Sequence, residues 1–418
     1  MFKSNLKNNI LKKINLEAIL LYLKFGLISI PGTTDFLRKK KIKFTNIYYK
    51  KIKKVIYDDL ILSLEKQLTD RITFCKKKQK EIVLFLSSGL DSRLLYYVIY
   101  NLCKKLNYLN NFFTLTAETS IHKRRYSEYN VLKKIFNTKI HQNKKIIVNY
   151  NNWYHETIKS NKINKRPING LAYISIKKLF EYSYNKFESP LIITGIGDSV
   201  FFNSNLKFFK NSKNNNFNLF SLDYIKYTNS NYLNKFFDNL AKIKRNKIKL
   251  LKLKEKIFKK KKYNFLINQQ FFYKGPKVVN EHSSLARFYQ CDYYSPYTDK
   301  IFYNLVLNLN SKLLFNKKSK TPVREMIKII TSKYPIDGIK LNNPQREILF
   351  KDYKKIYNKV ISNSILIDLG IVNKKALLKV YNNYLSKFRI GIFNNDIRKI
   401  SSYDLWKFIS LEIFLKEI

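Results

Sequence analysis

The segment from Leu86 to Ser92 reads Leu-Ser-Ser-Gly-Leu-Asp-Ser and has residue types that can bind a phosphate group. A short apolar run, 81–86, leads into it, and a stretch with helical apolar spacing, 90–102, follows it. This order predicts a strand, a tight loop and a helix. The first backbone N–H groups of such a helix attract an anion, and small side chains leave them accessible.

Hydroxyl and carboxylate groups in the same segment favour a nucleotide that carries a metal ion. Ser87 and Ser92 can donate hydrogen bonds to phosphate oxygens, whereas the Asp91 carboxylate is suited to holding Mg²⁺. The Gly-Lys-Ser/Thr sequence of a Walker loop does not follow. We therefore expect ATP and Mg²⁺ as the ligands.

Short apolar runs alternate with helix-like sequence through the middle of the chain. Runs at Asn111–Thr116 and Pro190–Thr194 follow the one that precedes the loop, and this alternation is typical of a parallel sheet. Apolar residues four apart over 56–72 predict a helix before the first strand, and helical spacing returns beyond Phe271. The expected fold class is α/β, a doubly wound parallel sheet with a largely helical C-terminal half.

The length of 418 residues favours two domains, or one domain with a large helical extension. We expect an N-terminal connector at 1–55, an ATP-binding α/β core at 56–202, a Lys/Asn-rich insertion at 203–270 and a helical part at 271–418 that completes the active site. The longest apolar stretch near the N-terminus is shorter than a membrane span. A cytoplasmic location is expected.

Composition limits the other classes of function. The formal charge of +52 favours anionic partners, but Lys, Asn, Ile, Tyr and Phe are enriched together along the chain, which indicates coding bias rather than one basic face. Nucleic acid is therefore a less favoured partner that stays open. Three separated cysteines argue against a disulfide framework, and four histidines without paired spacing are interpreted as structural.

The loop at 87–92 resembles the SGGxDS loop of PP-loop ATP pyrophosphatases, with Ser88 in place of the first glycine. Other segments resemble, in the same order, the synthetase domain of the asparagine synthetase family, whose relatives include β-lactam synthetase and lasso-peptide cyclases. These segments are YLKFGLISIPGTT, Ser127-Glu128 in RRYSEYNVLKKIF, LIITGIGDSVFF, YYSPYTDKIFYNLVLNL, KSKTPVREMIKIITSKYP and DGIKLNNP. They spread over residues 10 to 350, most of the chain.

The resemblance implies a set of site residues. Its ATP contacts would be Leu86, Ser87, Ser88, Gly89, Leu90, Asp91, Ser92, Leu115, Thr194 and Gly195. Asp91 and Asp198 would hold Mg²⁺, and Lys340 would be the catalytic cation that neutralises the leaving pyrophosphate. Gly338 stands where the family has an arginine, two residues before Lys340.

The implied activity is that of an ATP-dependent carbon–nitrogen ligase. Such an enzyme adenylates the carboxylate of a small-molecule or peptide substrate, releases pyrophosphate and transfers ammonia or an amine to form an amide. Ile196 occupies the position of a Glu or Tyr in the relatives, and the loop before Asp198 is one residue short. The chain starts Met1-Phe2 without a glutaminase pattern, so the amine would come from free ammonia, a separate glutaminase or the substrate itself.

Two other functions stay open. A tRNA-modifying PP-loop enzyme is favoured by the net charge and the shared loop, although the paired cysteines common in thiolation are missing. A non-catalytic relative that binds a nucleotide or a partner protein is suggested by Ser88, Ile196 and the shortened loop.

Overall fold

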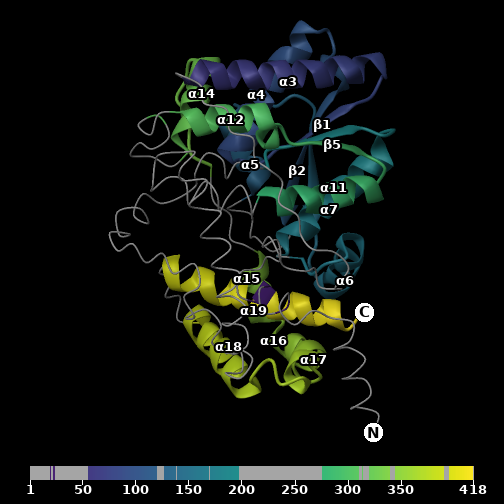
Figure 1. Cartoon of the computed structure of the whole chain (residues 1–418), viewed down its shortest axis with the longest axis vertical. Helices are drawn as coiled ribbons and strands as arrows, with labels where there is room; N and C mark the ends of the chain where they lie inside the picture. The colour runs from purple at the N-terminus through teal and green to yellow at the C-terminus, as the bar shows by residue number, and fades with distance from the viewer. Residues whose placement is uncertain are drawn as a thin grey trace, which may run out of the picture.

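A computed structural model gives the fold of most of the chain (Figure 1). It describes residues 19, 22–23, 55–119, 127–137, 139–168, 170–196, 275–309, 313, 320–338, 344–389 and 395–417. The expected insertion, 203–270, lies outside these residues, as does most of the expected connector, 1–55. The few connector residues that are described pack into the core, where the Tyr22 hydroxyl donates to the Ile168 carbonyl over 3.0 Å.

The centre of the described chain is a sheet of five parallel strands. The strands are β1 (Ile82–Phe85), β2 (Phe112–Thr119), β3 (Asn143–Val148), β4 (Leu191–Thr194) and β5 (Asp292–Tyr294). They lie in the order β3-β2-β1-β4-β5, and every neighbouring pair is parallel. The chain therefore adds β2 and β3 on one side of β1 and then β4 and β5 on the other side. This order confirms the doubly wound α/β fold. In such sheets ligands bind where the direction reverses, outside the carboxyl ends of the strands.

Alternate residues of the central strands serve two separate cores, because successive side chains of a strand point to opposite faces. Ile82, Leu84 and Ile193 join one apolar cluster, whereas Val83 and Ile192 join the other. All residues of β1 and β4 are buried. Both strands therefore read as continuous apolar runs, as expected for strands covered on both faces.

Helices cover both faces of the sheet (Figure 1). The first face is covered by α3 (Tyr57–Lys77), α4 (Leu90–Lys105), α12 (Lys300–Asn308) and α14 (Thr321–Thr331). The second face is covered by α7 (Ala172–Lys186) and α11 (Gly275–Phe288), with α6 (Trp153–Asn164) beside them. Shorter elements are η1 (Leu109–Asn111), α5 (Glu128–Ile135) and η6 (Pro296–Thr298).

The C-terminal part is helical, as expected. It comprises α15 (Pro344–Lys351), α16 (Tyr353–Ile356), the π-helical turn η7 (Tyr357–Ile361), α17 (Ile365–Asp368), α18 (Lys374–Arg389) and α19 (Asn395–Leu415). The described helices include none with the length and apolar character that a bilayer crossing requires.

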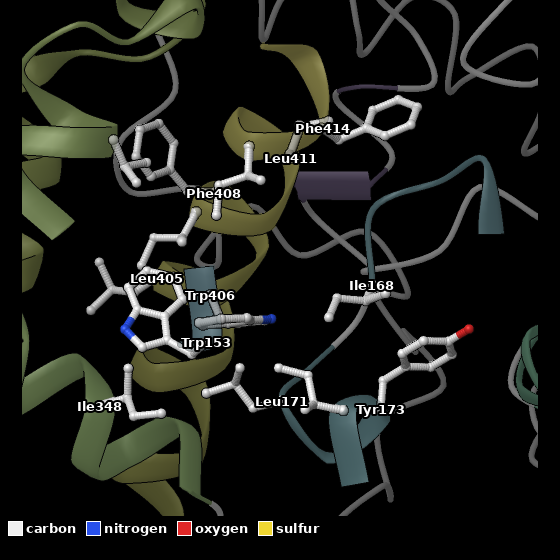
Figure 2. Packing of buried hydrophobic residues seen from close by; sticks show 14 of the residues in the cluster. Trp153, Ile168, Leu171, Tyr173, Ile348, Leu405, Trp406, Phe408, Leu411 and Phe414 are labelled. Carbon is white, nitrogen blue, oxygen red and sulfur yellow. The ribbon is translucent and has the colours of Figure 1, made fainter. Parts of the chain in front are cut away.

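Two tryptophans join the C-terminal helices to the second face of the sheet. Trp153 of α6 and Trp406 of α19 lie edge to face in Figure 2, with ring centroids 5.8 Å apart, and both are fully buried. The Trp153 Nε1–H donates to the Asp352 carboxylate over 2.6 Å. Figure 2 also shows Leu405 beside this pair. One continuous core therefore runs from the sheet into α19.

We predict that Trp406→Ala lowers the free energy of unfolding by about 3–5 kcal/mol, because it leaves a large cavity where α19 meets α6. Chemical denaturation measures this quantity. Phe288→Ala is the matched control, since Phe288 is 60% exposed and should cost less than about 1 kcal/mol. Equal losses for the two variants would show that α19 is not anchored through Trp406.

Candidate functional site

The turn between β1 and α4 is held together by its own two serines. The Ser92 Oγ accepts from the Ser87 N–H over 3.0 Å and lies 3.0 Å from the Ser87 Oγ. The Gly89 N–H donates to the Ser87 Oγ over 3.3 Å. These hydroxyls were expected to donate to phosphate, and here they define the shape of the loop. The α4 N-terminus, whose first N–H groups have no partner within the helix, begins at Leu90.

An acidic side chain from another element also reaches this turn. The Ser88 N–H donates to the Glu128 carboxylate at the start of α5. The Ser127 Oγ caps the same helix by accepting from the Asn130 N–H over 3.2 Å, and it donates to the Glu118 carboxylate over 2.7 Å. The Ser127-Glu128 pair singled out in the sequence is therefore placed at the loop by the cap of α5.

Two cations from α14 and its N-cap lie at the loop. Lys320, which has a left-handed backbone conformation (φ 56°), forms an ion pair with Asp91. Arg324, one turn later, forms an ion pair with Asp337 and is itself 4% exposed. The Lys-Thr-Pro-Val-Arg-Glu string that carries both cations was noted in the sequence as a resemblance, but neither residue was assigned to the site. Their position therefore emerges only from the fold.

The segment 334–338 crosses directly over the loop. The Arg93 Nη2 donates to the Ile336 carbonyl over 2.7 Å, and the Arg93 side chain is nearly fully buried. Burial lowers the pKa of Arg93 from its ordinary value. A Cβ on Gly338 would lie 2.8 Å from the Ser88 carbonyl carbon and closer still to its oxygen. Only glycine allows this approach, which gives a structural reason for glycine at position 338.

A cavity of about 690 Å³ opens at the carboxyl ends of β1 and β4, where the strand order reverses. Its loop end is charged and its far end is apolar. The described charged residues that line it are Asp91, Glu128, Lys320, Arg324 and Asp337. The apolar end is formed by Ala172, Ile176 and Leu179 of α7, and Ile196, after β4, also lines the cavity.

Most of the expected ATP contacts meet at this cavity. Nine of the ten line it, namely Leu86, Ser87, Ser88, Gly89, Leu90, Asp91, Ser92, Thr194 and Gly195. The tenth, Leu115, is buried in β2, where its carbonyl accepts from the Leu86 N–H over 2.8 Å; Ala117, two residues further along β2, lines the cavity. Asp198 and Lys340 lie outside the described residues, and their roles stay predictions.

Gly195 matters because the chain after β4 passes directly over the start of α4. A Cβ on Gly195 would lie 3.0 Å from the Ser92 backbone nitrogen. Beside it, the Thr194 Oγ1 lies 3.0 Å from the Tyr293 hydroxyl, and the Ser295 hydroxyl donates to the Ile196 carbonyl. These contacts join the residues at the end of β4 to β5 and to the residue after it.

His282 of α11 is the lining residue whose chemistry stands out at the apolar end. It is 3% exposed, and its ring lies 5.7 Å from that of Tyr293 and 6.1 Å from that of Phe180. Burial lowers the pKa of His282 to about 3, so the imidazole is neutral at physiological pH. Its Nδ1 has no hydrogen-bond partner in the described structure. The sequence offered no paired spacing to mark this residue, and it was set aside as structural.

The carboxylates that line the cavity could hold Mg²⁺ only together with oxygen atoms of a bound ligand. The described residues contain no cluster of three or more His, Cys, Asp or Glu side chains placed to hold a metal. Mg²⁺ is commonly bound through one or two carboxylates plus substrate phosphates. Asp91 and Glu128, both at the loop end of the cavity, fit that mode.

The chain matches no model of a known protein family and no curated protein.

We predict that Gly338→Ala lowers the free energy of unfolding by about 1–3 kcal/mol, because a methyl group at this position overlaps the Ser88 backbone. Amide hydrogen exchange should also become faster from Ser87 to Ser92. Ile336→Ala is the matched control, since Ile336 lies in the same crossing segment, has a side chain that is 67% exposed and accepts from Arg93 only through its backbone carbonyl. Unchanged exchange in Gly338→Ala would mean that the crossing segment does not hold the loop.

Proposed function

We propose that this protein is an ATP-dependent amide ligase that activates a carboxylate as its acyl-adenylate. The observation that carries the proposal is the strand–loop–helix turn at 86–92, which lies at the switch point of the sheet and lines one cavity together with Lys320 and Arg324. A helix N-terminus with nearby cations favours an anion. The cavity volume, about 690 Å³, lies within the usual range of ligand sites.

The first step forms one bond and breaks one. A carboxylate oxygen of the substrate attacks the α-phosphorus of ATP, and the bond from that phosphorus to the β-phosphate bridging oxygen breaks. Pyrophosphate leaves with the bonding electron pair, so negative charge develops at the loop. Lys320 and Arg324 would neutralise this charge where it forms, and Asp91 with Glu128 would hold magnesium, which supplies further charge neutralisation when bound.

The second step forms the amide. An amine attacks the acyl carbon, AMP leaves with the electron pair of the broken acyl–oxygen bond, and the amine loses a proton to a base or to solvent. Ile196 lines the cavity but offers no group that can take this proton. The chemistry therefore needs an amine that arrives uncharged, or a base other than the residue at 196.

A nucleotide-binding protein without turnover is the second candidate. Two observations favour it: Ile196 supplies no proton acceptor, and Lys320 is ion-paired with Asp91. The two candidates differ in one measurable respect. Both bind ATP, but only the ligase releases pyrophosphate when a carboxylate is added.

We predict that the full chain releases pyrophosphate from MgATP in the presence of a carboxylate from a panel of acids, with ammonia supplied. Lys320→Gln should slow this release by about 10²-fold, because it removes a preorganised cation from the developing charge. Lys328→Gln is the control, since Lys328 lies on the same helix and is exposed. Its rate should match that of the wild type.

ATP binding without pyrophosphate release under any acid of the panel would favour the second candidate. A Lys320→Gln protein that releases pyrophosphate at the wild-type rate would remove Lys320 from the reaction. Because this substitution also breaks the ion pair with Asp91, thermal unfolding of both variants must be compared first.

A further inference from the structure

The end of the cavity that α7 lines is apolar, whereas the triphosphate of a nucleotide needs charged partners. The described charged residues that line the cavity are at the loop end, around Asp91 and Lys320. The α7 side chains Ala172, Ile176 and Leu179 carry no charge, and the Ser175 hydroxyl is already hydrogen-bonded to Tyr150. This end is therefore suited to an uncharged, apolar part of a ligand.

His282 adds one polar position to this apolar wall. Its side chain is almost completely buried, lines the cavity and leaves Nδ1 without a partner among the described residues. A buried polar atom that has lost its water without gaining a hydrogen bond lowers stability. Such atoms in native structures call for an explanation, and an absent ligand is a direct one.

His282 and Leu86, one of the expected ATP contacts that line the cavity, belong to different faces of the sheet; Leu115, another expected contact, lies on the second face but does not line the cavity. Leu86 belongs to the cluster on the first face. His282 instead contacts Phe180 and lies against Tyr293, both on the second face. Phe85, also on the second face, packs edge to face against Phe180 at 5.1 Å. A nucleotide that occupies the turn and rests on Leu86 thus leaves the His282 end for another molecule.

We propose that His282 selects the carboxylate substrate by a hydrogen bond from its Nδ1 position to a neutral polar group of that substrate, whose body is apolar and packs against α7. This inference rests on the proposed function and names the substrate class of the same site. It disfavours aspartate, because the ammonium and the second carboxylate that remain when one carboxylate reacts would find no opposite charge at this end among the described lining residues. Burial keeps the imidazole neutral, which matches a neutral partner.

The test uses the full chain labelled with ¹⁵N-histidine. The chain has four histidines, so the His282 ring signals can be assigned by their loss in His282→Leu. The nucleotide site is first filled with α,β-methylene-ATP and Mg²⁺, an analogue whose α–β link cannot be cleaved at oxygen. N-acetylphenylalanine, which carries an apolar body and one neutral amide, is then titrated, with aspartate as the matched charged probe.

N-acetylphenylalanine is expected to move the His282 ring signals saturably, whereas the analogue alone and aspartate leave them in place. His282→Leu should weaken N-acetylphenylalanine binding by about five- to tenfold, the loss expected for one neutral hydrogen bond. Its affinity for the analogue should stay within about twofold, because the change leaves every residue of the turn in place. His282→Asn, which restores a polar group, should recover part of the loss.

Two results would overturn this inference. The first is movement of the His282 signals by the analogue alone with no further effect of the acid, which would place the nucleotide base at His282. The second is a His282 ring that responds to neither acid. Binding of the analogue is measured separately by calorimetry. A protein that does not bind the analogue refutes the proposed function. A protein that binds the analogue but whose His282 ring signals do not change with either acid refutes only the substrate assignment.

Discussion

The close approach of three backbone segments at the end of β1 is the constraint on which the site depends. The turn at 86–89 can be compact because Ser87 and Ser92 hydrogen-bond to each other across it. Gly195 and Gly338 then allow two further segments to approach it, one over the start of α4 and one over Ser88. A side chain at Gly338 would overlap the Ser88 backbone, and one at Gly195 would crowd the start of α4 at Ser92.

The reversal of strand order at β1 places the loops after β1 and β4 around one cavity. Because β4 returns to the side of β1 opposite β2, the ends of β1 and β4 lie together, and the loops that follow them enclose one space. Helix α14 packs on α4 and so brings Lys320 to Asp91. Helix α11 packs on α7 and β5 and closes the opposite end with His282. Charge at one end and apolar surface at the other thus follow from which helix covers which face.

The local features of this arrangement were predictable from the sequence, and the long-range ones were not. The strand, turn and helix around Ser87–Ser92 follow from apolar periodicity and small residues within one short segment. Lys320 is 229 positions from Asp91, and although its segment resembled one of the family's, that resemblance did not single out Lys320 among 81 basic residues as the one beside the loop. His282 has no neighbouring motif, and its isolation from hydrogen-bond partners is a property of the folded core. Gly338 stands where the resembled family has an arginine, and sequence alone cannot show that a glycine is needed there for the backbone contact with Ser88.

The most direct test of the central claim, that the turn at 86–92 holds the phosphates of ATP, is calorimetric titration of the full chain with MgATP, repeated in the presence of inorganic pyrophosphate. Binding at one site is predicted, with pyrophosphate weakening the apparent affinity for ATP because both anions would compete for the N–H groups at the start of α4. No binding of MgATP, or binding that saturating pyrophosphate leaves unchanged, would contradict the assignment of this turn as the phosphate site.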